Sequence, residues 1–63
     1  MYFREDGITK QLFRKGDKLP EEYIREKNIW ETTTDAIDAF YEGIDTYRIT
    51  EDEAAKNLES FKK

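Results

Sequence analysis

Residues 32–47 read TTTDAIDAFYEGIDTY, and this stretch carries the clearest helical pattern in the chain. Its apolar residues recur at the intervals of one buried helix face: Ala36, Ile37, Phe40, Ile44 and Tyr47. Thr33 or Thr34 is the expected N-cap, because a threonine hydroxyl accepts a hydrogen bond from a free N–H of the first turn. We therefore predict a helix over residues 34–47, in which Gly43 indicates either a close helix contact or an early end.

Four carboxylates of the same stretch lie three or four positions apart: Asp35, Asp38, Glu42 and Asp45. On a helix that turns about 100° per residue they share one side, nearly opposite Phe40, and point to solvent. One interpretation is that this acidic side is only the solvated face that an amphipathic helix ordinarily has. Two facts favour the other interpretation, that the acidic side has a function. Like charges at this spacing cost about 0.2–0.5 kcal/mol per pair, and no lysine or arginine lies between Glu31 and Tyr47.

The N-terminal residues 1–14 carry a hairpin signal, because Asp6-Gly7 separates two short runs that contain aromatic and β-branched residues. With Asp6 and Gly7 at the centre of a type I′ turn, Glu5 would oppose Ile8. One face of this hairpin is apolar: Met1, Phe3, Ile8 and Leu12. Since the other face is mixed, the hairpin needs a helix to cover its apolar side.

A short helix is predicted over residues 20–27. Pro20 suits the first helical position, and the acids Glu21 and Glu22 that follow face the positive end of the helix dipole. This segment would connect the hairpin to the longer helix.

A last helix is predicted over residues 51–62. Thr50 and Glu53 have the spacing of a capping box, in which each side chain bonds the main chain of the other. The sequence thus predicts a small α+β fold, a single domain over residues 1–63, with an N-terminal hairpin packed on two or three helices.

The charge is unevenly distributed. Residues 1–30 hold seven basic and six acidic residues, whereas residues 31–59 hold nine acidic and two basic ones, and the whole chain of 63 residues has a net charge of −4. The C-terminal half is therefore acidic, while the hairpin is mildly basic.

Composition argues against catalysis. The chain has no cysteine and no histidine, which removes disulfides, the usual zinc sites and the commonest nucleophile and general-base pairs. We expect no enzyme activity, no cofactor and no metal. No apolar run reaches the length of about 20 residues that spans a bilayer, and the start MYFREDG lacks a signal-peptide core; a cytoplasmic protein without membrane contact is expected.

The predicted function is that of an acidic interaction module, which binds and modulates or inhibits a basic partner protein that handles nucleic acid. The residues predicted to contact the partner are Asp35, Asp38, Tyr41, Glu42 and Asp45. Helical steps place these carboxylates about 4.5–6 Å apart along the axis, which is compatible with mimicry of a DNA phosphate row. In size and charge the chain resembles the small acidic proteins that bacteriophages use to inhibit enzymes acting on DNA, which implies a viral origin.

Two alternatives remain open, with a monomer or a homodimer as the expected state. In the first, the hairpin binds nucleic acid through phosphate contacts and base stacking, with these residues: Arg4, Lys10, Arg14, Lys15, Tyr2 and Phe13. In the second, the chain self-associates through aromatic residues without an assured place in the core: Tyr2, Phe13, Trp30 and Tyr41.

Overall fold

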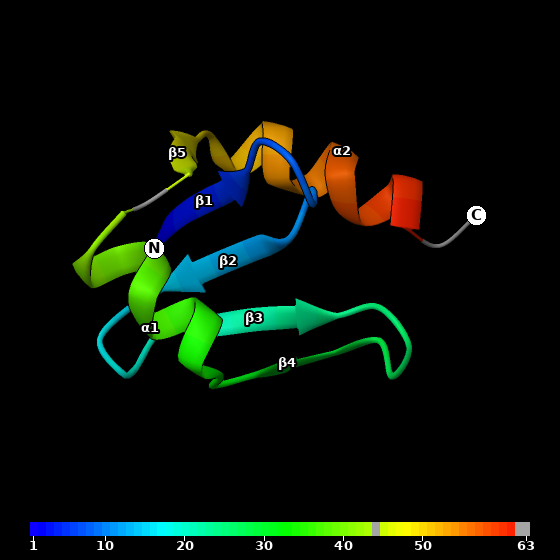
Figure 1. Cartoon of the computed structure of the whole chain (residues 1–63). Coiled ribbons are helices and arrows are strands. Elements are labelled where there is room, and N and C mark those ends of the chain that lie inside the picture. Colours follow the sequence, from blue (N-terminus) through cyan, green and yellow to red (C-terminus); the bar gives the residue numbers. More distant parts are fainter. Residues whose placement is uncertain (44, 62–63) are drawn as a thin grey trace.

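A five-stranded antiparallel sheet with one helix on each face forms the fold in the computed structural model, which describes residues 1–43 and 45–61 (Figure 1). The elements in chain order are β1 (Tyr2–Asp6), β2 (Leu12–Lys15), β3 (Glu21–Ile24), β4 (Ile29–Glu31), α1 (Thr34–Tyr41), β5 (Thr46–Ile49) and α2 (Glu51–Phe61). The strand order is β4-β3-β2-β1-β5. The predicted hairpin packed on two or three helices is therefore wrong, because the sheet dominates the described residues.

The N-terminal hairpin is present, but its predicted register is wrong. Glu5 lies opposite Leu12 rather than Ile8. The loop is longer than two residues because the Asp6 carboxylate accepts hydrogen bonds from the N–H groups of Ile8 (2.8 Å) and Thr9 (2.9 Å). Lys10 then adopts a left-handed φ of 64°, which closes a wider turn.

The predicted short helix over residues 20–27 is wrong, because this segment forms β3 and the turn to β4. The two acids that indicated a helix start have partners elsewhere. Glu21 accepts a hydrogen bond from Arg14 on β2 (2.9 Å), and Glu22 accepts one from the Thr33 hydroxyl (2.8 Å). Asn28 takes a left-handed φ of 55° in the turn, a conformation that asparagine tolerates better than most residues.

The predicted helix over residues 34–47 begins as expected and ends early. Thr33 is the N-cap, and its hydroxyl accepts from the Ala36 N–H (3.0 Å). The helix stops at Tyr41, since Gly43 has a φ of 68° and its N–H donates to the Asp38 carbonyl (2.9 Å), an arrangement typical of helix ends. The chain then turns back to the sheet as β5; Ile44, expected on the buried face, lies outside the described residues.

The predicted capping box of the last helix is confirmed. The Glu53 N–H donates to the Thr50 hydroxyl and the Thr50 N–H donates to the Glu53 carboxylate, both at 3.1 Å. The expected final residue 62 of this helix lies outside the described residues, among which α2 ends at Phe61.

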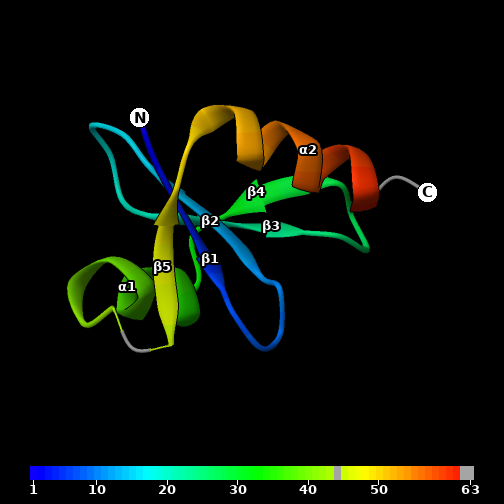
Figure 2. The ribbon, with the colours of Figure 1, turned by 90° about the horizontal axis from the view of Figure 1, so that it is seen from above.

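Each face of the sheet carries its own hydrophobic core. Under α2, Leu12, Tyr23 and Ile49 pack with Ala54. Under α1, a second cluster contains Phe13, Ala36 and Ala39. Figure 2 shows the two helices on opposite sides of the strands. The expectation that only one face of the hairpin needs a cover is thus wrong, because Phe13 is as deeply buried as Leu12.

Candidate functional site: an acidic pocket beside α1

Three of the predicted partner-binding residues line one shallow pocket. Asp35, Asp38 and Glu42 on or just after α1 face Asp6 at the end of β1, and the pocket has a volume of about 250 Å³. Its remaining lining comes from Gln11, Phe13, Ala39 and Thr46. We call this feature the α1 pocket. It combines carboxylates at the rim with the buried ring of Phe13 and the small side chain of Ala39 below.

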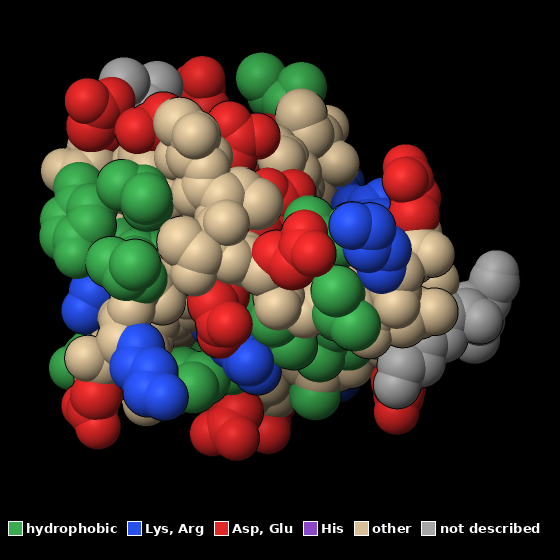
Figure 3. All heavy atoms as spheres, turned by 90° about the horizontal axis from the view of Figure 1, so that it is seen from below, with side chains coloured by type: hydrophobic (Ala, Val, Ile, Leu, Met, Phe, Trp, Pro, Cys, Tyr) green, Lys and Arg blue, Asp and Glu red, His purple; other side chains and the backbone are tan. Residues whose placement is uncertain are grey.

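The carboxylates of the α1 pocket form no ion pair within the described residues. There, the ion pairs are Arg14–Glu21 at 2.9 Å and Lys27–Glu31 at 3.5 Å, and both lie elsewhere. Asp35 has a neutral partner, because its carboxylate accepts from the Gln11 amide at 3.1 Å. Acidic side chains gather along the upper border of Figure 3, over α1, with no lysine or arginine side chain visible among them. The negative charge is thus open to solvent.

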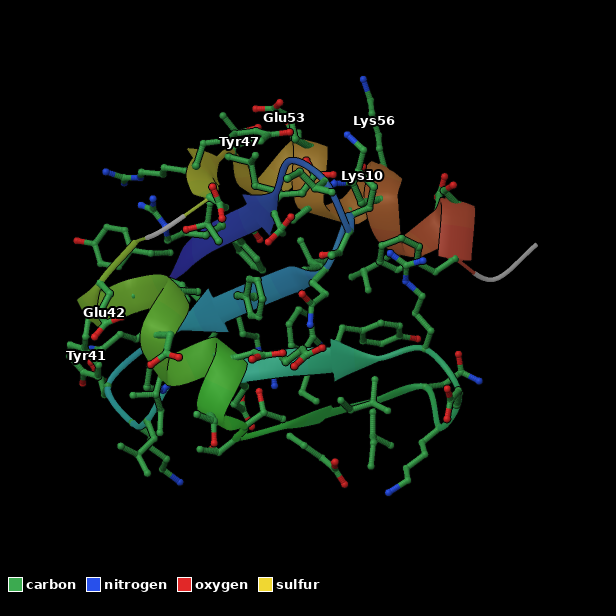
Figure 4. All side chains as sticks on the ribbon, in the orientation of Figure 1. Lys10, Tyr41, Glu42, Tyr47, Glu53 and Lys56 are labelled. Carbon is green, nitrogen blue, oxygen red and sulfur yellow. The ribbon has the colours of Figure 1, made fainter. Side chains whose placement is uncertain are left out.

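The two other predicted site residues lie outside the pocket lining. Asp45 is not on the helix, which has already ended; it precedes β5 with a φ of 58°, and its carbonyl accepts from the Gly7 N–H at 3.2 Å. Tyr41 is 64% exposed, and Figure 4 shows it beside Glu42 at the end of α1. The expected row of four carboxylates on one helix is therefore broken after Glu42.

Asp6 is the site residue that sequence reasoning missed. Hydrogen bonds from the main-chain N–H groups of Thr9 and Ile8 hold the pKa of the Asp6 carboxyl below its ordinary value of 3.8. These bonds favour the ionised form, and the positive charge of Lys10 acts in the same direction as a smaller cause. The Asp-Gly pair predicts a tight turn at this place, and that prediction does not include a role for the Asp6 carboxylate in the site.

The residues expected to bind nucleic acid are partly used by the fold. Arg4 donates to the Thr46 hydroxyl (2.9 Å) and carbonyl (2.8 Å). Arg14 pairs with Glu21 and lies 4.2 Å from the centre of the Trp30 ring, while Phe13 is only 2% exposed. Lys15 donates to the Gly16 carbonyl (3.4 Å) and Arg48 lies over the Tyr2 ring, so among the described contacts Lys10 is the one of the six whose side chain has no partner.

The aromatic residues considered for self-association separate into two groups. Phe13 is buried and Trp30 packs edge-on against Tyr23, with 5.3 Å between ring centres. Tyr2 and Tyr41 are exposed. Tyr2 lies under the guanidinium of Arg48, 4.7 Å from its ring centre, so Tyr41 is the member of this set that projects most freely.

Neither a metal site nor a membrane-spanning helix is found in the part of the chain that the structure describes. Within residues 1–43 and 45–61, no group of three or more metal-ligating side chains is placed to hold a metal ion. In the same part of the chain, no helix has the length and apolar character required to cross a membrane.

Comparisons with known proteins returned no relative: no family model, no curated protein and no solved structure matches the chain.

Proposed function

We propose that this protein is an acidic interaction module that binds a basic partner protein through the α1 pocket and thereby modulates or inhibits it. The supporting observation is the uncompensated charge of Asp6, Asp35, Asp38 and Glu42, which line one pocket and have no ion pair within the described residues. Such a surface attracts a basic protein from a distance and fixes its orientation on contact. A partner that handles nucleic acid fits best, because its phosphate-binding surface is already basic.

Charge reversal tests this proposal. Asp38→Lys/Glu42→Lys changes the net charge from −4 to 0, since each replacement adds two charges. The matched control, Glu26→Lys/Glu59→Lys, makes the same change at exposed positions in the β3–β4 turn and on α2. Binding is measured against a library of lysine- and arginine-rich peptides at about 50 mM salt, where screening is weak.

We expect the pocket variant to lose about tenfold or more in affinity for the peptides that the unmodified protein binds, while the control loses much less. An equal loss in the two variants means that net charge alone attracts the peptides, and the α1 pocket is then not the site. No loss in either variant contradicts the proposal altogether.

A further inference from the structure

β5 is an outer strand of the sheet, and its main chain is partly unpaired. In an antiparallel ladder, directly opposed residues alternate between hydrogen-bonded and non-bonded pairs. The Gly7 N–H donates to the Asp45 carbonyl, so the bonded pairs of the β1–β5 ladder continue at Tyr47 and Ile49. The N–H groups of Thr46 and Arg48, and the Arg48 carbonyl, therefore point away from β1. Figure 2 looks onto this edge and shows no helix or strand of the described residues covering it.

A hollow lies at each end of this open edge. Thr46, the first residue of β5, also lines the α1 pocket. At the other end, a hollow of about 400 Å³ is lined in part by Arg48, Thr50, Glu51 and Glu53. Each hollow thus contains carboxylates, and β5 connects them. With its flanking residues, the strand spans about 17 Å in extended geometry.

Acidic residues lie at both ends of this edge, and a basic residue lies between them. Asp45 precedes the strand, and three acids in the first turn of α2 follow it: Glu51, Asp52 and Glu53. Figure 4 shows Glu53 near Tyr47, whose hydroxyl donates to the Glu5 carboxylate at 2.7 Å. The exposed side chain of Arg48 lies between these acidic ends. The edge is therefore negative at both ends and positive at its centre.

We propose that an extended segment of the partner protein adds to the sheet along β5, with basic residues at its two ends and uncharged residues at its centre. Main-chain hydrogen bonds to Arg48 and Thr46 would hold the segment, as in other cases of strand addition. Its terminal basic side chains enter the two acidic hollows, while uncharged residues face Arg48, because like charges directly opposed destabilise a strand pair. This inference rests on the proposed function and adds the shape of the ligand.

A second copy of this chain is a poorer occupant of the same edge. In the two-fold antiparallel register centred on Arg48, this residue opposes its own copy, and Asp45 opposes Glu51 of the second copy. Both contacts join like charges. A net charge of −4 on each copy adds further repulsion. A basic segment is complementary where the second copy is not.

The test compares Arg48→Pro with Arg48→Ala. Both remove the positive charge, but only proline removes the outward N–H, and proline is tolerated on an edge strand whose N–H faces solvent. Circular dichroism and thermal unfolding verify that each variant folds. The probe is a synthetic octapeptide with two lysines at each end and alternating threonine and valine between them. A peptide of the same composition with all four lysines at its centre is the control.

We expect the end-lysine probe to bind more tightly than its control, and Arg48→Pro to bind it about tenfold more weakly than Arg48→Ala. In the unmodified protein, the probe should slow amide hydrogen exchange at Thr46 and Arg48 and leave Trp30 on β4, the other sheet edge, unchanged. The exchange measurement keeps the test valid if Arg48→Pro does not fold.

Three outcomes overturn the inference, and they are distinguishable. If Arg48→Pro binds the probe as well as Arg48→Ala does, without slowed exchange on β5, strand addition is wrong, although the α1 pocket still stands if Asp38→Lys/Glu42→Lys weakens binding. If that charge reversal also has no effect, the proposed function fails as well. If the free protein is a dimer with slow exchange at Arg48, a second copy occupies the edge.

Discussion

At the scale of single residues, Asp6 joins the fold to the candidate site. Its carboxylate accepts two main-chain hydrogen bonds that shape the β1–β2 loop, at 2.8 Å from Ile8 and 2.9 Å from Thr9. The same side chain lines the α1 pocket. A negative charge at this place is thus maintained mainly by loop geometry, with a smaller contribution from the charge of Lys10, and it remains available to a partner.

The replacement Asp6→Asn tests the role of this charge in folding. The pKa of Asp6 in the folded state lies below its ordinary value of 3.8. The ionised carboxylate therefore contributes stability that is fully present above pH 3.8, and this contribution is lost as the pH falls through the pKa of the folded state. Asparagine keeps a carbonyl oxygen for the two N–H groups but cannot ionise. Thermal unfolding from about pH 6 to about pH 2 should show the two proteins converging in stability below 3.8. If the stabilities of the two proteins differ by a constant amount over this pH range, the ionised Asp6 carboxylate does not stabilise the fold.

At the scale of elements, the end of α1 decides the topology. The helical periodicity of residues 32–47 continues past Gly43, yet the chain leaves the helix there and residues 46–49 pair with β1. Gly43 can adopt its φ of 68° without the steric cost that a Cβ brings. This turn frees Thr46–Ile49, in which three of four residues are β-branched or aromatic, to complete the sheet.

Replacing Gly43 should therefore destabilise the fold, whereas replacing Gly7 should not. Gly43→Ala forces alanine into a left-handed conformation, with an expected cost of about 1–2 kcal/mol. A steric clash does not contribute to this cost, because the atom nearest to a Cβ added at Gly43 is Nη2 of Arg4, at an ordinary contact distance of 3.6 Å. Gly7 has no positive φ, and its nearest contact is also at 3.6 Å, so Gly7→Ala is the matched control. Denaturant unfolding measures both; equal effects would show that the backbone conformation at Gly43 is not critical.

Local signals predicted the starts of both helices and the presence of the first hairpin, because caps and turns depend on residues a few positions apart. They failed for β3. Pro20-Glu21-Glu22 has the local features of a helix start, but the acids bond to Arg14 and Thr33, which are 7 and 11 positions away from their partners. Long-range partners override local propensity at such places. Asp35, Asp38 and Glu42 were predictable from the sequence, whereas the contribution of Asp6 required the packing that brings the end of β1 to the pocket beside α1.

At the scale of the whole molecule, the acidic half of the chain brings carboxylates to both faces of the sheet. Its carboxylates lie on α1, at the start of β5 and in the first turn of α2. Among the described residues, Glu21 pairs with Arg14 and Glu31 with Lys27, whereas the carboxylates of the α1 pocket form no ion pair. Folding alone favours compensated charge, so a surface that keeps repulsive carboxylates together is expected to lower stability in exchange for binding.

The replacement Glu42→Lys tests this balance. It removes a repulsion with Asp38 and introduces an attraction at the same four-residue spacing, and it places a cation at the C-terminal end of α1, where the helix dipole favours one. We expect the free energy of unfolding to rise by about 0.5–1 kcal/mol at low salt, and this gain to shrink at about 1 M salt, where charges are screened beyond about 3 Å. Glu26→Lys, in an exposed turn, should show a smaller gain. If Glu42→Lys instead destabilises the protein, Glu42 serves the fold. A gain in stability together with weaker binding of basic peptides is the combination that a functional acidic surface requires.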